Sequence, residues 1–222
     1  MKLVHLLLDL LYPPKCILCQ RLLNRRETDL CTHCREHTDS HIQGKDKISF
    51  VASSVCLWYY EGKVRDSLLR FKFSGHRNYA DAYARLLAMK LLSKRDEIDL
   101  ITWVPVSKAR LRRRGFDQCQ LLACALAREL NIPAVCTLQK IRNNQVQSRL
   151  SDYSHRKANV LGVYRSLHKD VFHGKRVLLV DDIITSGATL SECARVLVTD
   201  GAGSILGAAV AAASHTPNSK NR

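Results

Sequence analysis

The most constraining stretch of this 222-residue sequence runs from Val177 to Leu190 and reads VLLVDDIITSGATL. Its first four residues form an unbroken apolar run, which is typical of a parallel strand that is covered on both faces. Asp181 and Asp182 follow, so we expect both carboxylates at the carboxyl end of a strand, where open α/β sheets bind their ligands. The sequence therefore predicts an α/β fold with a binding site at this strand.

A turn of small and hydroxyl-bearing residues comes next, at the start of a helix. It consists of Thr185, Ser186, Gly187, Ala188 and Thr189. Glycine lets backbone amides approach a ligand, and a helix N-terminus attracts anions. Because carboxylates accept hydrogen bonds from sugar hydroxyls, the pattern predicts a pocket for a phosphorylated sugar. Two structural alternatives remain: Thr189 and Glu192 match a capping box, and neighbouring strand residues point to opposite faces, which would leave one aspartate to the scaffold.

The strand, the acid pair and the turn resemble the phosphoribosyl-pyrophosphate motif of type I phosphoribosyltransferases. The resemblance implies that Asp181 and Asp182 face the ribose hydroxyls and that residues 185–189 wrap the 5-phosphate. A Walker loop is excluded because the chain has no Gly-Lys-Ser/Thr in such a context, and a Rossmann fingerprint is excluded because the glycine cluster at residues 201–207 follows a helix.

A second ligand loop is expected after another strand, at residues 99–104. The turn that follows includes Val106, Ser107 and Lys108, and in a parallel sheet it would lie beside the acid pair. Five of the seven residues 108–114 are basic. Clustered guanidinium groups repel one another unless an anion neutralises them, so we expect a basic loop that binds pyrophosphate or a nucleic-acid backbone.

A third segment, residues 140–157, is polar and nearly free of acids, which predicts a mobile loop that closes over the site. Its candidate ligands are Lys140, Arg142, Gln145 and Arg156. An ordinary solvated loop is the alternative interpretation.

The amino-terminal part contains two C-x-x-C pairs, formed by Cys16 with Cys19 and by Cys31 with Cys34. Two such pairs close a tetrahedral zinc site, and four thiolates leave no open position, so we expect a structural zinc ribbon. An iron–sulfur cluster, two redox pairs, and ligation by His33 or His37 are the alternatives. We expect this module to span residues 1–45 and an α/β domain to span residues 46–222.

Composition narrows the class of protein further. A net charge of +15 favours polyanionic partners, and 46% apolar residues supply an ample core. The five cysteines outside the two pairs lie singly in apolar surroundings and are expected to be small buried side chains. The first fourteen residues predict a short amphipathic helix, no segment is long and apolar enough to span a membrane, and reduced cysteines favour a cytoplasmic location.

Over nearly its full length the chain resembles the ComF family of competence proteins. The resemblance is carried, in order, by YPPKCILC, CTHC, FKFSGH, VPVSKARLRRRGFDQ, residues 145–159 and VLLVDDIITSGAT. Asp117 stands where the family usually has asparagine, and Ser186 where it usually has threonine. The resemblance implies a type I phosphoribosyltransferase-like parallel sheet flanked by helices behind a zinc ribbon.

The same resemblance implies a role in natural competence, with single-stranded DNA and a helicase-like protein as partners in the cytoplasm. A catalytic domain would bind phosphoribosyl pyrophosphate with Mg²⁺ and would use Lys108 and Arg142 to stabilise the leaving pyrophosphate. No residue identifies the acceptor. A nucleobase-salvage transferase and a non-catalytic, zinc-stabilised nucleic-acid binder remain the alternatives.

Overall fold

The structure is a computed structural model that describes residues 13–38, 48–142 and 161–213. The expected amino-terminal helix, the domain boundary at residues 45 and 46, and the candidate ligands Gln145 and Arg156 all lie outside the described residues.

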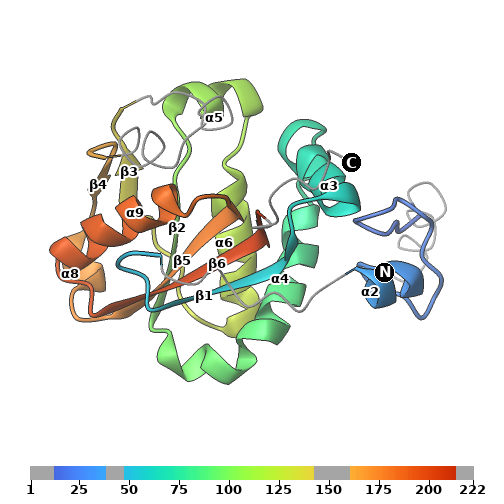
Figure 1. Ribbon diagram of the computed structural model, residues 1–222, viewed down its shortest axis with the longest axis horizontal. Helices are drawn as coiled ribbons and strands as arrows, with labels where there is room; N and C mark the ends of the chain where they lie inside the picture. Colours follow the sequence, from blue (N-terminus) through green and yellow to red (C-terminus); the bar gives the residue numbers. More distant parts are fainter. Residues whose placement is uncertain (1–12, 39–47, 143–160, 214–222) are drawn as a thin grey trace, which may run out of the picture.

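A four-stranded parallel sheet forms the centre of the fold (Figure 1). It consists of β1 (Ser53–Tyr59), β2 (Leu100–Trp103), β5 (Arg176–Ile184) and β6 (Ser204–Ala212), in the order β1-β6-β5-β2. Parallel pairing brings the carboxyl ends of the strands to one edge, where Trp103 of β2 lies opposite Val180 of β5. The predicted parallel α/β sheet is therefore confirmed, and its strand β5 continues past the acid pair.

The central strand β6 is rich in alanine and was not predicted as a strand. Alanine has a low strand propensity, so sequence patterns do not favour an extended conformation here. Burial on both faces overrides this preference, because residues 208–212 are all at most 3% exposed. Close packing also explains Gly207, where a Cβ atom would lie 2.8 Å from Leu190 Cδ2 and 3.2 Å from Ser54 Cβ.

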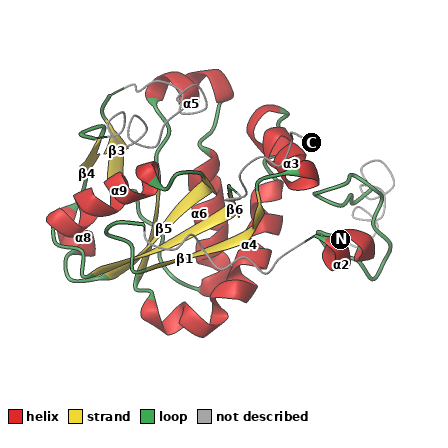
Figure 2. Cartoon of the chain, in the orientation of Figure 1, coloured by secondary structure: helices red, strands yellow, loops and turns green. Residues whose placement is uncertain are grey.

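Helices cover both faces of the sheet (Figure 2). The helices α4 (Tyr79–Leu91) and α6 (Gln118–Leu130) pack along one face, and α9 (Ala188–Thr199) lies along the other. The remaining helical elements are α2 (Thr32–His37), α3 (Gly62–Phe73), η1 (Leu92–Glu97), α5 (Lys108–Arg114) and α8 (Lys169–Phe172).

The capping-box interpretation of Thr189 is wrong. Gly187 is the N-cap of α9, with a left-handed φ of 81°, so Thr189 already lies in the first helical turn. Glu192 bonds elsewhere: its carboxylate accepts from the Gly162 amide at 2.8 Å and from Arg195. The left-handed conformation that glycine permits places the N-cap two residues before the predicted one.

The basic run at residues 108–114 forms α5, and the expectation of a basic loop is wrong. Ser107 caps this helix by accepting a hydrogen bond from the Arg110 amide, and Gly115 ends it with a φ of 77°. Ser107 and Gly115 are ordinary signals for the start and end of a helix. The sequence prediction missed them because it rested on the high charge density of the segment.

The predicted loop at residues 140–157 also begins differently. Lys140 ends β3 (Leu138–Lys140), which pairs with β4 (Tyr164–Ser166) in a separate antiparallel ribbon. The paired residues of β3 and β4 are at least 24 positions apart in the sequence. No local sequence pattern could therefore predict this pairing. Lys140 is therefore held by a strand, while residues 143–160 are outside the described part.

The single cysteines only partly follow the prediction. Cys56, Cys119 and Cys193 are buried, Cys124 is half-buried, and Cys136 is exposed. The expectation that all five are buried is wrong at Cys136, which follows the short parallel bridge at Ala134 on the edge of the sheet. Among the described residues, no helix is long and apolar enough to cross a membrane.

Residues 13–38 form a cysteine module that shares one continuous core with the α/β domain. Leu18 and Leu30 of the module are buried in the same cluster as Leu68 and Phe71 of α3. Polar contacts reinforce the interface: Arg85 of α4 forms two hydrogen bonds with the Asp29 carboxylate, at 2.8 and 2.5 Å. The module is thus built into the fold.

Phe71 tests this packing. It is fully buried and makes ring contacts with Tyr83 and Phe116, so Phe71→Ala is expected to lower the free energy of unfolding by about 3–5 kcal/mol. Urea denaturation at fixed zinc concentration measures the change. Phe73→Ala on the same helix is the control, because Phe73 is 61% exposed and should lose less than about 1 kcal/mol.

Candidate ligand pocket and metal centre

The carboxyl edge of the parallel sheet contains a cavity of about 300 Å³, called here the acid-lined cavity. Three strand ends contribute to it: Tyr60 after β1, residues 104–106 after β2, and the end of β5. The other lining residues are Lys72, Arg110, Arg114, Gln118, Cys119, Lys140, Tyr164 and Thr189. A cavity at this edge is the expected position of a ligand in an open α/β sheet.

Asp181 and Asp182 both line this cavity and are 9% and 6% exposed. The Oδ1 atom of Asp182 lies 2.9 Å from Lys72 Nζ, and its Oδ2 atom accepts a hydrogen bond from Gln118 Nε2 at 2.6 Å. Asp181 Oδ1 accepts from the Asp182 amide at 2.8 Å and from Cys119 Sγ at 3.5 Å. Both aspartates therefore line the cavity, whereas one alternative interpretation left one of them to the scaffold.

Burial shapes the ionisation of this acid pair. Removal from water, followed by the charge of Asp182, raises the pKa of Asp181 to about 7, against the lowering effect of the Asp182 amide and Lys72. A ligand that brings cations or hydroxyl donors would favour the charged form of Asp181. The acid-lined cavity therefore holds a carboxylate whose charge a suitable ligand would stabilise.

The hydroxyl-rich turn follows directly. Thr185 and Thr189 line the acid-lined cavity, and Ser186, Gly187 and Ala188 form the turn between them. Ser186 Oγ accepts a hydrogen bond from the Ala188 amide at 3.3 Å. A Cβ atom on Gly187 would lie 3.1 Å from the Ile48 side chain, so packing and the left-handed backbone both favour glycine.

Four cationic side chains surround the same cavity. Arg110 and Arg114 lie one helical turn apart on α5, and Arg114 also hydrogen-bonds the Gln118 side chain. Lys140 lies with its Nζ atom 5.3 Å from the centre of the Tyr164 ring. Burial and the nearby Arg110 lower the pKa of Lys140 to about 8, as expected for an amine in a positively charged, partly dry pocket.

A second cavity of about 330 Å³ adjoins the first and is called here the basic cavity. Its lining residues are Ser107, Lys108, Gln139, Lys140, Ile141, Arg142 and Arg165. The predicted catalytic residues Lys108 and Arg142 thus lie here, and the predicted Val106 lines the acid-lined cavity. Lys140 lines both cavities and joins them.

Several lining residues were not singled out from the sequence, above all Lys72 of α3. Lys72 stands between two phenylalanines in FKFSGH, and helical periodicity alone gives no sign that it reaches the acid pair. The role of Gln118 could not be predicted from the sequence, because only the packing of α6 brings its side chain to Asp182. Asp117, the departure from the family pattern, caps α6 by accepting from the Cys119 and Gln120 amides, and it also accepts from the Val106 amide.

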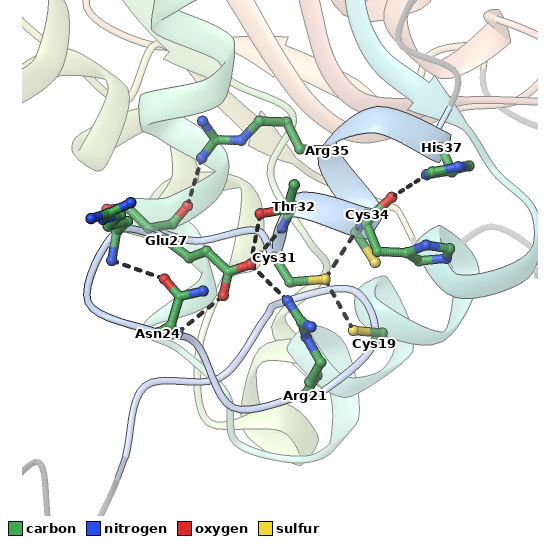
Figure 3. A network of polar contacts seen from close by, with 12 residues as sticks. Cys19, Arg21, Asn24, Glu27, Cys31, Thr32, Cys34, Arg35 and His37 are labelled. Carbon is green, nitrogen blue, oxygen red and sulfur yellow. Dashed lines mark hydrogen bonds and ion pairs between the residues drawn. The ribbon is translucent and has the colours of Figure 1, made fainter.

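The four cysteines of the two C-x-x-C pairs come together in the cysteine module, and Figure 3 shows three of them, Cys19, Cys31 and Cys34. Their sulfur atoms all lie within 4.8 Å of one another, and Cys19 Sγ is 3.6 Å from Cys31 Sγ. A tetrahedral zinc with Zn–S bonds of about 2.3 Å requires sulfur atoms roughly 3.8 Å apart. The arrangement therefore fits a structural zinc, which would leave no position for a substrate.

Glu27 fixes the loop between the two cysteine pairs (Figure 3). Its carboxylate accepts hydrogen bonds from the Asn24 amide at 3.0 Å and the Thr32 amide at 2.7 Å, and it pairs with Arg21 at 2.6 Å. These bonds, with the Asn24 and Thr32 amides foremost, lower the pKa of Glu27 to about 2. The carboxylate stays charged and holds the second pair in place at neutral pH.

The two histidines beside the second pair lie outside the group of thiols. His33 and His37 are exposed and stack on each other, with ring centres 4.5 Å apart. The basic residues that the sequence places on this module are all exposed as well: Lys15, Arg21, Arg25, Arg26 and Arg35.

A parallel sheet with a buried acid pair and a hydroxyl turn defines a phosphoribosyltransferase-type domain, here joined to a zinc ribbon. Comparison with known families agrees: the phosphoribosyl transferase domain matches residues 117–221, and the double zinc ribbon domain matches residues 7–45.

Two curated relatives cover most of the chain. The DNA utilization protein YhgH of Escherichia coli K12 is 30% identical over 200 residues, which are 86% of each chain. Competence protein F of Haemophilus influenzae is 28% identical over 207 residues, 82% of this chain and 90% of the relative. The chain belongs to the family of these proteins, the ComF family.

A solved structure, the glutamine phosphoribosylpyrophosphate amidotransferase of Bacillus subtilis, is also similar. It is 20% identical with a TM-score of 0.45, and the matched region covers 64% of this chain and 30% of that one.

The raised pKa of Asp181 predicts a pH-dependent gain in stability on removal of its charge. Because the folded pKa lies above the unfolded value of about 4, the buried charge destabilises the fold increasingly as pH rises toward 7. Asp181→Asn should therefore raise the free energy of unfolding by roughly 1–3 kcal/mol at pH 8 and by less at pH 5.5. A gain that does not change with pH would contradict this explanation, and Asp96→Asn, at a side chain 99% exposed, is the control.

Proposed function

We propose that this protein binds phosphoribosyl pyrophosphate with Mg²⁺ and acts on incoming single-stranded DNA in natural competence. The carrying observation is the acid-lined cavity, in which two buried carboxylates, a hydroxyl turn and four cations meet at one sheet edge. The carboxylates can accept hydrogen bonds from sugar hydroxyls, and the turn and the cationic side chains can bind phosphate groups.

In the proposed complex each element has one task. Asp181 and Asp182 would accept hydrogen bonds from the ribose hydroxyls, and residues 185–189 would hold the 5-phosphate at the start of α9. Mg²⁺ would be held mainly by ligand oxygens, as is usual for this ion. The pyrophosphate group would extend past Val106 and Ser107 toward the basic cavity.

We further propose that the domain is a transferase of the pentosyl type. A nucleophile would attack C1 of the ribose, the bond from C1 to the pyrophosphate oxygen would break, and pyrophosphate would leave with both electrons. Lys108 and Arg142 would be the catalytic residues, since both line the basic cavity and carry positive charge toward the leaving group.

The proposed cellular role rests on charge and on the family. A net charge of +15 attracts single-stranded DNA, and the relatives are named as competence or DNA utilization proteins. Another relative at 26% identity is Competence protein ComFC of Bacillus subtilis. A helicase-like competence protein is the proposed partner, and the free cysteines suit the reducing cytoplasm.

Calorimetric titration with phosphoribosyl pyrophosphate and Mg²⁺ tests the ligand. The wild-type protein should bind one ligand per chain, and Asp181→Ala combined with Asp182→Ala should weaken binding by about 100-fold or more, because two charge-assisted contacts are lost. Asp96→Ala with Glu97→Ala is the matched control, because Asp96 and Glu97 are also consecutive acidic residues but are exposed on η1. Failure of the wild type to bind would refute the proposal.

Salt dependence tests the interaction with single-stranded DNA. Arg112 and Arg113 are exposed on α5, whereas Arg110 and Arg114 face the acid-lined cavity. Replacement of both exposed arginines by methionine should lower the affinity and reduce the log–log salt slope by about 1.4, or about 0.7 per lost phosphate contact.

The same titration on Arg25→Met with Arg26→Met compares α5 with the cysteine module, because both of these arginines are exposed there. A wild-type affinity that stays constant as salt is added would exclude an electrostatic DNA surface on either element.

A further inference from the structure

Helix α3 lies beside the cysteine module (Figure 1), and its residue Lys72 lines the acid-lined cavity. On one side it binds the module: Ser67 Oγ donates to the Ile17 carbonyl at 2.5 Å, and Arg70 donates to the Ile17 and Leu18 carbonyls at 3.1 and 2.7 Å. Ile17 and Leu18 are the two residues between the first pair of cysteines. Helix α3 therefore holds the backbone of the first zinc knuckle directly.

On its other side α3 supplies Lys72 to the cavity. Residues two apart in a helix lie about 200° apart around its axis, so Arg70 and Lys72 point to opposite sides. Lys72 Nζ lies 2.9 Å from Asp182 Oδ1, and its side chain is only 15% exposed. Phe71 between them is fully buried, which leaves the helix little freedom to turn.

This ion pair and the bond from Gln118 engage both oxygens of Asp182. A ribose hydroxyl or a metal-bound ligand that reaches Asp182 Oδ1 must therefore compete with the Lys72 ammonium. An ammonium that leaves Asp182 but stays in the cavity needs a new anion, because a buried charge without a partner is costly. The phosphate groups of the incoming ligand supply one.

We propose that Lys72 is a ligand-binding residue of the acid-lined cavity and that the zinc module positions it through α3. Lys72 neutralises Asp182 until a ligand arrives, and it then pairs with an anionic group of the ligand. Because the helix that carries Lys72 is bound to the first zinc knuckle, zinc binding and sugar-phosphate binding favour each other, and thermodynamic linkage makes this effect reciprocal. The proposal rests on the proposed function of the cavity.

Calorimetry on the zinc-loaded full chain tests Lys72. With phosphoribosyl pyrophosphate and Mg²⁺, Lys72→Met should weaken binding about tenfold, and Lys72→Arg, which keeps the charge, should stay within about threefold of the wild type. Lys63→Met is the matched control, because Lys63 lies exposed at the start of the same helix and away from this cavity. Melting curves and zinc content check the fold of each variant.

The results distinguish the role of Lys72 from the identity of the ligand. Equal or tighter binding by Lys72→Met, alongside normal binding by the wild type, would overturn the role of Lys72 and leave the proposed ligand intact. A wild-type protein that does not bind would overturn both.

Zinc release to an excess of chelator tests the positioning by the module. Saturating phosphoribosyl pyrophosphate should slow release from the wild type several-fold, and the slowing should disappear in Arg70→Met, which loses the bonds to the knuckle. Arg65→Met on the same helix, whose side chain is 55% exposed, should keep the slowing. If Arg70→Met does not fold, ligand-saturated Lys72→Met replaces it and should also lose the slowing. A release rate of the wild type that ligand does not change would overturn the coupling.

Discussion

Two adjacent carboxylates buried near the carboxyl end of β5 are the constraint on which the arrangement of the other elements depends. Carboxylates removed from water require counter-charges and hydrogen-bond donors. Asp182 receives both, from Lys72 of α3 and Gln118 of α6, and Asp181 remains with a raised pKa. Strand, helices and turn thus converge on a site whose electrostatics favour a ligand that brings hydrogen-bond donors or positive charge.

The cysteine module is part of this arrangement and not an appended domain. Its closed set of four thiols suits a structural ion, and a structural ion contributes folding energy where the chain is too short to build a core of its own. The bound ion would stabilise the part of the fold around α3 and α4, because Leu18 and Leu30 of the module are buried in the same core as these helices. The module also bonds to α3, which carries Lys72 into the wall of the pocket.

The sequence predicted the features that depend on local pattern. The buried strand at residues 177–180, the cysteine pairs and the placement of the acid pair at a sheet edge all follow from periodicity and spacing, and the structure has them. It did not predict what tertiary packing decides. The alanine-rich β6 is a strand because it is central, Lys140 lies in a strand because a distant partner pairs with it, and Lys72 reaches Asp182 because of the way α3 packs in the fold.

The most direct test of this account is a crystal structure of the zinc-loaded protein with phosphoribosyl pyrophosphate and Mg²⁺. The account predicts the ribose against Asp181 and Asp182, the 5-phosphate at the turn before α9, and Lys72 Nζ moved from Asp182 Oδ1 to a ligand oxygen. An ordered ligand bound elsewhere, or one in the cavity with the pair between Lys72 and Asp182 unbroken, would contradict it.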